Sequence, residues 1–359
     1  MENMVTELDF DDFYSNKKVL ITGHTGFKGS WLAIWLQKMG AEVIGYSLPP
    51  KTDPNLFTVA NVENGMTSLF GDIRDLSKIS KVISEYKPTI VFHMAAQALV
   101  RESYNEPVET FETNVMGTVN VLEAVRNSKS VVSCLIVTSD KCYENREWER
   151  GYREDDAMGG NEPYSASKGC AELVVAAFRK SFFEKNNNTA VASVRAGNVI
   201  GGGDWATDRL VPDIMRTISN GSSLKLRYPN SYRPWQHVLD PLSGYLVLAK
   251  KLYIDRDEVA EAWNFGPDED QVITVSDLVY KISEYMGADL TIKEEQSELE
   301  EMMRLKLDSS KAHRHLGWKP RLSIDNAIRY TADWFAAYFR NSLAAQSLVN
   351  EQINSFMDD

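Results

Sequence analysis

Short apolar runs alternate with longer segments of helical spacing over the first 200 residues of the chain. Apolar runs predict strands at 18–23, 41–47, 68–73, 89–96, 131–139 and 189–201, and helical spacing predicts helices at 29–40, 75–86, 114–127 and about 164–185. The run at 131–139 is apolar without interruption, which is typical of a strand covered on both faces. The alternation predicts an α/β fold with a doubly wound, parallel Rossmann sheet and right-handed crossovers.

The alternation becomes irregular after Gly201. Loops rich in Gly, Pro and Trp (201–208 and 227–237) separate short helical patterns, and an amphipathic helical pattern follows near the end of the chain. We therefore expect a dinucleotide-binding domain over 1–200, with a return segment at about 235–262. The remainder, 201–359, is expected to form mainly a smaller, mixed C-terminal substrate lobe, which agrees with domain sizes of about 100–200 residues.

Composition and charge narrow the classes of function. The chain has 39 basic and 51 acidic residues, and the net charge of −12 argues against a general nucleic-acid or membrane surface. The amino-terminal segment "MENMVTELDFDDFYSNKK" lacks the apolar core of a signal peptide, and no apolar stretch has the length of a membrane span. Cys134, Cys142 and Cys170 lack metal-ligand spacing. These features favour a cytoplasmic protein with reduced thiols and no metal.

A glycine-rich turn, "ITGHTGFKGSWL", follows the first predicted strand and opens the first predicted helix. Gly23, Gly26 and Gly29 are spaced G-x-x-G-x-x-G rather than G-x-G-x-x-G. Glycines permit a tight turn, and the amino terminus of a helix offers N–H groups and the positive end of its dipole to a pyrophosphate. This context predicts a dinucleotide site. His24, inside the turn, either shapes it or has no chemical role.

Residues at the ends of the next two predicted strands are candidates for binding the adenosine part of the dinucleotide. Asp72, in "GDIRD", is predicted either to accept a hydrogen bond from an adenine amino group or to cap the following helix. The second strand does not end in the acidic residue that usually binds the adenosine ribose, because Ser47 stands there and Lys51 follows. This loop therefore leaves NAD and NADP both open.

Two further segments carry candidate proton-transfer groups. Tyr164 and Lys168, in "YSASK", are four residues apart and share one helix face. A tyrosine acts as a base near neutral pH only if its pKa falls from about 10 to about 7. One cation at about 4 Å supplies roughly the required 4 kcal/mol at an effective dielectric constant near 20. We therefore expect Lys168, with a cationic nicotinamide, to lower the pKa of Tyr164. In "TSDKCY", Asp140 and Lys141 place an acid beside a base at a strand end.

The segments "TGHTGFKG", "HMAAQ", "TSDK", "YSASK" and "RAGNVIG" together resemble the extended short-chain dehydrogenase/reductase family across nearly the whole chain. Within that family, "GHTGFKGSWL", "TSDKCYEN", "GGGDWATDRLVPD" and "RPWQHVLDPLSGYL" resemble the nucleotide-sugar 4,6-dehydratases that act on CDP-D-glucose. The resemblance implies tightly held NAD and a CDP-D-glucose substrate. It also implies deoxysugar biosynthesis, as for a lipopolysaccharide O-antigen, and a homodimer or dimer of dimers that uses helices at 107–127 and 164–185.

The resemblance also implies roles for the candidate catalytic residues. Tyr164 would remove the C4 hydroxyl proton while hydride leaves C4, Ser139 would hydrogen-bond the C4 oxygen, and Asp140 would protonate the departing C6 hydroxyl. Return of the hydride to C6 would give a 4-keto-6-deoxy sugar. Lys141 stands where dTDP-glucose relatives carry glutamate. It is therefore either the base that removes the C5 hydrogen or a salt-bridge partner of Asp140.

The resemblance implies two sets of binding residues. The cofactor set is Gly23, His24, Gly26, Phe27, Lys28, Gly29, Ser47, Asp72, Ile73, Ala95, Ala96, Gln97, Asn114, Tyr164 and Lys168. The substrate set is Ser139, Asn198, Arg209, Arg233 and Arg304. Arginine suits this second set because its planar fork matches phosphate oxygens. Asn114 starts a predicted helix, so it is expected to cap that helix, and the resemblance also implies that it supports the active-site lysine; both roles can hold together. His93 is expected to orient the loop that follows it.

Three alternatives stay open at this point. A nucleotide-sugar 4-epimerase would share the same fold and cofactor, but it needs no acid at C6, so the Asp140–Lys141 pair favours a dehydratase. A dehydratase for a different nucleoside-diphosphate hexose is not distinguished, because no residue reads the base. A non-catalytic dinucleotide-sensing module is disfavoured, because such a module has no need of both Tyr164 and Lys168.

Overall fold

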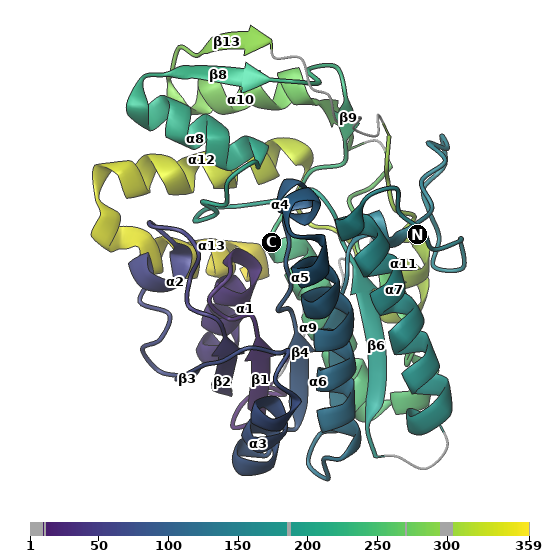
Figure 1. Ribbon diagram of the computed structural model, residues 1–359. Coiled ribbons are helices and arrows are strands. Elements are labelled where there is room, and N and C mark those ends of the chain that lie inside the picture. Colours follow the sequence, from purple (N-terminus) through teal and green to yellow (C-terminus); the bar gives the residue numbers. More distant parts are fainter. Residues whose placement is uncertain (1–9, 11, 185–187, 270, 295–303, 359) are drawn as a thin grey trace, which may run out of the picture.

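Seven parallel strands form one sheet in the order β3-β2-β1-β4-β5-β6-β11 (Figure 1). The computed structural model describes residues 10, 12–184, 188–269, 271–294 and 304–358. The strands are β1 (Lys18–Thr22), β2 (Glu42–Ser47), β3 (Thr67–Phe70), β4 (Ile90–His93), β5 (Ser133–Val137), β6 (Ala190–Arg195) and β11 (Ala262–Asn264). The predicted doubly wound α/β fold is confirmed. The strand order reverses between β1 and β4, which creates a switch point where ligands usually bind.

Helices cover both faces of this sheet. The helices α1 (Phe27–Lys38) and α9 (Leu239–Ile254) pack on one face, and α3 (Leu76–Tyr86), α6 (Gly117–Arg126) and α7 (Pro163–Phe178) pack on the other. Side chains of β5 alternate between the two cores, since Leu135 and Val137 lie in the first and Cys134 and Ile136 in the second. This burial on both faces explains the uninterrupted apolar run.

Several elements differ from the predicted boundaries. The strand predicted at 68–73 ends at Phe70, and the one predicted at 189–201 is divided into β6 and β7 (Val199–Ile200). Asn198 has a φ of 50°, so the backbone turns there before β7 pairs with β10 (Gln236–His237). The helices predicted at 114–127 and 164–185 include the π-helical segments η1 (Glu112–Met116) and η3 (Arg179–Phe183). Residue 185, the predicted end of the second helix, lies outside the described residues.

A smaller lobe lies above the carboxyl ends of the strands in Figure 1. It contains α8 (Leu210–Asn220), β8 (Ser223–Leu226), β9 (Tyr232–Arg233), β12 (Ile273–Thr274), α10 (Val275–Met286), β13 (Thr291–Glu294) and α12 (Ile324–Arg340). The pair β8–β13 is parallel and the pair β9–β12 is antiparallel. The chain then returns to the sheet domain through α13 (Ala345–Asp358), whose Phe356 ring packs against Trp35 of α1.

Short elements complete the described chain. They are α2 (Leu56–Val59), α4 (Val100–Asn105), α5 (Pro107–Phe111), η2 (Asp140–Cys142), η4 (Arg256–Glu258), α11 (Ser310–Leu316) and η5 (Ser342–Ala344). The turn η2 is the important one for chemistry, because it holds Asp140 and Lys141 directly beyond β5. Within the described ranges, no helix combines the length and apolar character that crossing a bilayer requires.

Candidate active site

The glycine turn after β1 packs so closely against neighbouring backbone that two of its glycines leave no room for a side chain. Gly23 has a φ of +80°, and a Cβ there would lie 2.7 Å from the Ala95 nitrogen. A Cβ at Gly29 would lie 2.1 Å from the Gly23 carbonyl oxygen, far below ordinary contact. No described side chain caps α1 at Gly26. The first N–H groups of α1 therefore face an open cradle that suits a pyrophosphate.

His24 anchors this turn to the neighbouring strands. Its Nε2 lies 2.8 Å from the Ser68 hydroxyl, and its ring lies so close to Gly45 that a Cβ there would be 2.3 Å from the ring. Burial lowers the pKa of His24 to about 4. The imidazole is therefore neutral near pH 7, and its contacts support the turn-shaping interpretation.

The predicted adenosine-binding residues lie at the ends of β2 and β3. The Ser47 hydroxyl lies 2.9 Å from that of Thr25 in the glycine turn. Asp72 does not cap α3, because the helix begins later and Asp75 is its N-cap. The capping alternative for Asp72 is therefore wrong. The carboxylate of Asp72 instead accepts hydrogen bonds from the Arg74 side chain at 2.7 and 2.9 Å, and these hydrogen bonds lower its pKa.

Asn114 and His93 position the loop after β4. Asn114 lies inside η1, not at a helix start, so its predicted capping role is also wrong. Its side chain accepts from the Gln97 N–H at 2.9 Å and donates to the Gln97 carbonyl at 3.0 Å and to the Ser167 hydroxyl at 2.9 Å. His93 is buried, with Nδ1 2.7 Å from the Thr22 hydroxyl, and that hydroxyl oxygen accepts from the Ala95 N–H. These contacts agree with the predicted orienting role of His93.

Ser139, Asp140 and Tyr164 meet in one buried cluster at the carboxyl end of β5. The Ser139 hydroxyl donates to Asp140 Oδ1 at 2.9 Å, and the Ser139 side chain lies beside the Tyr164 hydroxyl, whose pKa it acts to lower. On its other side the Asp140 carboxylate presses on the backbone of Gly197, where a Cβ would lie 1.9 Å from Oδ2. A carboxyl group and a phenol are thus held around one serine.

The pKa values of Tyr164 and Lys168 are set mainly by burial. Burial raises the pKa of Tyr164 to about 12, and the neighbouring Ser139 opposes that rise. Burial and then the charge of Lys28 lower the pKa of Lys168 to about 8, while its Nζ donates to the Val137 carbonyl at 3.5 Å. Desolvation of the phenolate therefore dominates in the chain by itself, and the lowering of the Tyr164 pKa by Lys168 together with a cationic nicotinamide stays a prediction.

Lys141 lies apart from this cluster. Its side chain is exposed, although its backbone N–H donates to the Ser139 hydroxyl at 3.3 Å. Within the described chain, Lys141 and Asp140 form no ion pair, and the Asp140 carboxylate accepts from Ser139 instead. The salt-bridge alternative for Lys141 is therefore wrong in this structure.

The structure brings only some of the predicted substrate-binding residues to the catalytic cluster. Arg209 donates to the Asp204 carboxylate at 2.9 Å, and its charge lowers the pKa values of both Tyr164 and Lys28, so it borders the catalytic cluster. Asn198 lies directly beyond β6. Arg233 belongs to β9 of the smaller lobe, and the side chain of Arg304 is 54% exposed, with an ion pair to Glu149 at 3.8 Å.

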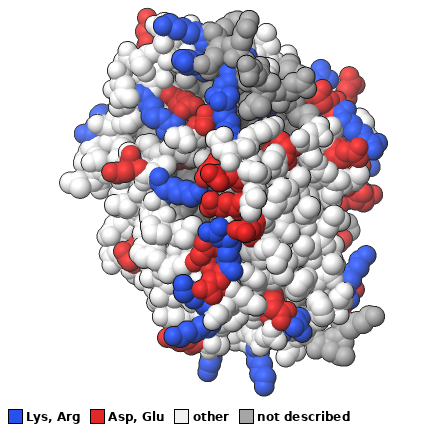
Figure 2. Space-filling model, in the orientation of Figure 1, with Lys and Arg blue, Asp and Glu red and all other residues white. Residues whose placement is uncertain are grey.

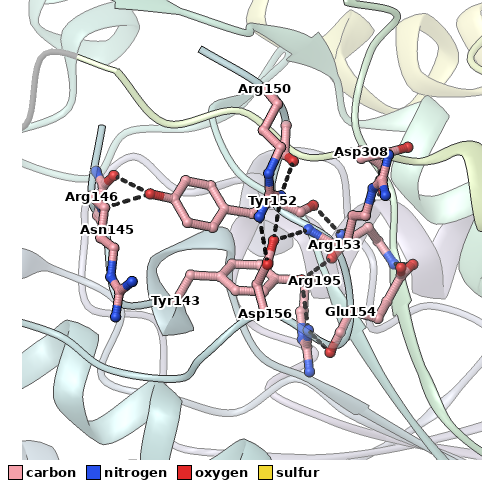
Figure 3. A network of polar contacts seen from close by, with 12 residues as sticks. Tyr143, Asn145, Arg146, Arg150, Tyr152, Arg153, Glu154, Asp156, Arg195 and Asp308 are labelled. Carbon is pink, nitrogen blue, oxygen red and sulfur yellow. Dashed lines mark hydrogen bonds and ion pairs between the residues drawn. The ribbon is translucent and has the colours of Figure 1, made fainter. Parts of the chain in front are cut away.

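A buried ion pair behind the cluster was missed by the sequence reading. Glu172 on α7 and Arg195 at the end of β6 pair at 2.7 Å, with each side chain only 4% exposed. Arg195 also donates to the Tyr143 hydroxyl at 2.6 Å and to the Glu154 carbonyl at 3.1 Å (Figure 3). The signal for Glu172 was available, since it follows Tyr164 and Lys168 at the same spacing of four residues. Arg195 had no such signal.

Comparisons with known proteins agree with this geometry. The family model described as GDP-mannose 4,6 dehydratase matches residues 20–331. The CDP-glucose 4,6-dehydratase of Salmonella typhimurium strain LT2 is 51% identical over 334 residues, which cover 92% of this chain and 93% of that protein. The NAD complex of Thermus thermophilus UDP-glucose 4-epimerase has a TM-score of 0.77 and 25% identity, over 89% of this chain and 98% of the other. An NAD-bound dTDP-glucose 4,6-dehydratase double mutant from Streptomyces venezuelae has a TM-score of 0.78 and 24% identity, over 92% and 99% of the two chains.

Proposed function

Because the chain belongs to the GDP-mannose 4,6-dehydratase family, we propose that it is an NAD-dependent lyase that converts CDP-D-glucose to CDP-4-keto-6-deoxy-D-glucose. The observation that carries the proposal is the placement of Ser139 against both the Asp140 carboxylate and the Tyr164 hydroxyl. Dehydration of a hexose across C5 and C6 after oxidation at C4 requires a base and an acid near one ring. The 51% identity to a CDP-glucose 4,6-dehydratase supports the choice of substrate.

The residues beyond β1, β2 and β3 fit a dinucleotide. The cradle that Gly23 and Gly29 leave open would receive the pyrophosphate at the amino terminus of α1, Ser47 would bind the adenosine ribose, and Asp72 would bind the adenine. The rest of the proposed cofactor set is His24, Gly26, Phe27, Lys28, Ile73, Ala95, Ala96, Gln97, Asn114, Tyr164 and Lys168. Bound NAD would supply reversible hydride chemistry at C4 and C6 of the hexose.

The chain's own groups would move the protons. Tyr164 takes the proton of the C4 hydroxyl, while Ser139 hydrogen-bonds the C4 oxygen. Burial holds the pKa of Tyr164 at about 12, and the neighbouring Ser139 and the charge of Arg209 oppose it by favouring the phenolate. Asp140, packed against Gly197, then protonates the C6 hydroxyl as it departs as water.

Lys141 is the proposed base for the C5 hydrogen, which the C4 ketone makes acidic. A lysine removes a proton only as a neutral amine, and burial favours that form. Its side chain is exposed in the structure, so the proposal requires the bound sugar to cover it. The C5 proton then resides on Lys141 and the C6 oxygen leaves with the proton of Asp140, which balances the elimination.

The nucleotide end of the substrate would lie between the sheet and the smaller lobe. We assign the diphosphate to Arg233 and Arg304, the diphosphate or the sugar to Asn198, and closure of the nucleotide pocket to Arg209. Arg209 has the strongest structural support, because its charge acts on the catalytic cluster. Arginine forks bind phosphate oxygens in pairs, which suits this assignment.

We also propose a homodimer built on α5, η1, α6 and α7. Figure 2 shows a broad uncharged area over these helices, beside a band of mixed charge. Exposed apolar side chains on these helices and the adjoining α4 and η3 are Tyr104, Val108, Phe111, Met116, Leu173 and Phe182. Val108 and Leu173 are 69% and 61% exposed, and apolar patches of this kind mark protein interfaces.

The three unpaired cysteines suit a cytoplasmic location.

Conversion of nucleotide sugars tests the proposed function. The purified protein is incubated separately with CDP-, dTDP-, UDP- and GDP-glucose, and the 4-keto product is followed by its absorbance in alkali. Preferential conversion of CDP-D-glucose is expected. Equal conversion of all four would contradict the substrate assignment, and formation of CDP-galactose without a 4-keto product would show a 4-epimerase.

A further inference from the structure

Both ends of the six-residue segment "TSDKCY" are tied to the same buried ion pair. At its start, the Thr138 hydroxyl donates to Glu172 Oε1 at 2.5 Å. At its end, the Tyr143 hydroxyl accepts from Arg195 Nη1 at 2.6 Å. Glu172 and Arg195 join the two ends through their own contact at 2.7 Å. The residues between these ends are the turn η2 and Ser139, which the proposed mechanism uses.

We propose that Thr138, Tyr143, Glu172 and Arg195 form a clamp that positions the catalytic turn Ser139–Lys141 against Tyr164. The inference rests on the proposed function for its catalytic part. None of the four is proposed to touch the substrate, so they are positioning residues. The clamp links three elements: the end of β5, the end of β6, and the face of α7 that bears Tyr164 and Lys168.

The physical basis of the clamp is the cost of leaving its buried groups unpaired. Glu172 and Arg195 are withdrawn from water, and a buried charge that loses its partner is strongly destabilised. Each carboxylate oxygen of Glu172 has a partner, since Oε1 accepts from Thr138 and Oε2 accepts from Arg195 and from Ser193. A shift of either end of the segment would break one of these bonds, so the turn between them is held in place.

The clamp also reaches the segment that carries Arg304. The Tyr143 hydroxyl donates to Asn264 Oδ1 at 2.7 Å, and Asn264 Nδ2 donates to the carbonyls of Tyr152 at 2.8 Å and Asp308 at 3.2 Å. Tyr152 pairs with Leu307 in a β-bridge. Figure 3 shows Tyr143, Tyr152 and Asp308 gathered in this network. The end of the clamped segment is therefore connected through Asn264 and Tyr152 to Leu307 and Asp308.

Two variants that keep side-chain shape test the clamp, and a third is the matched control. Thr138→Val and Tyr143→Phe each remove one hydroxyl from an end of the segment. Ser193→Ala removes a hydroxyl that donates to the same Glu172 carboxylate at 2.8 Å, but Ser193 lies on β6, outside the turn. A merely structural role would make Thr138→Val and Ser193→Ala equivalent, because each takes one hydrogen bond from Glu172.

With CDP-D-glucose, the clamp predicts that Thr138→Val and Tyr143→Phe lower kcat by about tenfold or more, since misplacement of catalytic groups by 1 Å costs about 10²-fold. KM changes little, because none of the four clamp residues is proposed to touch the substrate. Ser193→Ala keeps the wild-type kcat. Equal kcat values in Thr138→Val and Ser193→Ala would overturn the clamp.

Alkylation of Cys142 tests the clamp without any activity. Cys142 is fully buried inside the held segment, and Cys134 is fully buried in β5 outside it. Under native conditions, N-ethylmaleimide should modify Cys142 about tenfold faster in Thr138→Val and Tyr143→Phe than in Ser193→Ala, with Cys134 unchanged, because local opening exposes only the segment. Equal Cys142 rates in all three would overturn the clamp. A wild type inactive on CDP-D-glucose, with these alkylation differences present, would refute the proposed function and retain the clamp.

Discussion

The replacement Gly197→Ala should displace the proposed acid, Asp140, from its position beside Ser139. A Cβ at position 197 would lie 1.9 Å from Asp140 Oδ2 and 2.1 Å from its Cγ, whereas ordinary contact begins at 3.4 Å. The carboxylate must therefore move by about 1.5 Å, and a displacement near 1 Å costs about 10²-fold in rate. Gly197 does not adopt a positive φ, so alanine is compatible with its backbone.

The expected result is a fall of about 10²-fold in kcat for CDP-D-glucose with little change in the amount of bound NAD. Because the elimination needs the displaced acid and C4 oxidation does not, reduced nicotinamide should build up to a higher steady level than in the wild type. Gly266→Ala is the control, since its Cβ would meet Leu307 Cβ at 3.3 Å and touch no catalytic group. A folded Gly197→Ala enzyme with wild-type kcat would refute the reasoning that Asp140 must be held in this position.

Three other predictions concern the cofactor, the C5 base and pH-dependent stability. Gly29→Ala should abolish NAD retention, measured as cofactor released on denaturation, because its Cβ would lie 2.1 Å from the Gly23 carbonyl oxygen; full NAD content would contradict the cradle. Lys141→Ala should stop exchange of C5 deuterium from labelled substrate while C4 oxidation persists; wild-type exchange would remove Lys141 from the mechanism. Burial raises the pKa of Asp240 to about 7, so the unfolded state releases this proton first and the fold loses stability as pH rises from about 4 to about 7, by about 4 kcal/mol. Urea unfolding of the wild type and Asp240→Asn at pH 5 and pH 8 should show the part of this loss that falls between pH 5 and pH 7, about 2.7 kcal/mol, only with the aspartate, and parallel pH dependence would contradict it.

The sheet and the glycine turn could be predicted because local pattern determines them. Uninterrupted apolar runs identify strands buried on both faces, and the turn after β1 needs glycines for reasons that concern only adjacent backbone. Alternation of strand and helix then orders the strands and brings their carboxyl ends to one edge. Ser47, Ser139 and Asn198 therefore follow strands that end along that edge, as the sequence reading expects.

The parts of the site that could not be predicted depend on burial and on long-range contacts. Whether Lys141 pairs with Asp140 depends on the direction that η2 gives each side chain, and the structure exposes one and buries the other. The pKa of Tyr164 depends on desolvation by elements distant in sequence, which no spacing reports. The Glu172–Arg195 pair joins α7 to β6, and nothing near Arg195 in the sequence identifies its partner.

The central claim is that one buried cluster oxidises C4 and then directs the same hydride to C6 of the same hexose. CDP-D-glucose labelled with deuterium at C4 tests this most directly, with the product analysed by mass spectrometry and NMR. The deuterium should appear at C6 of the 4-keto-6-deoxy sugar. Deuterium that returns to C4, or that is lost to solvent, would contradict it.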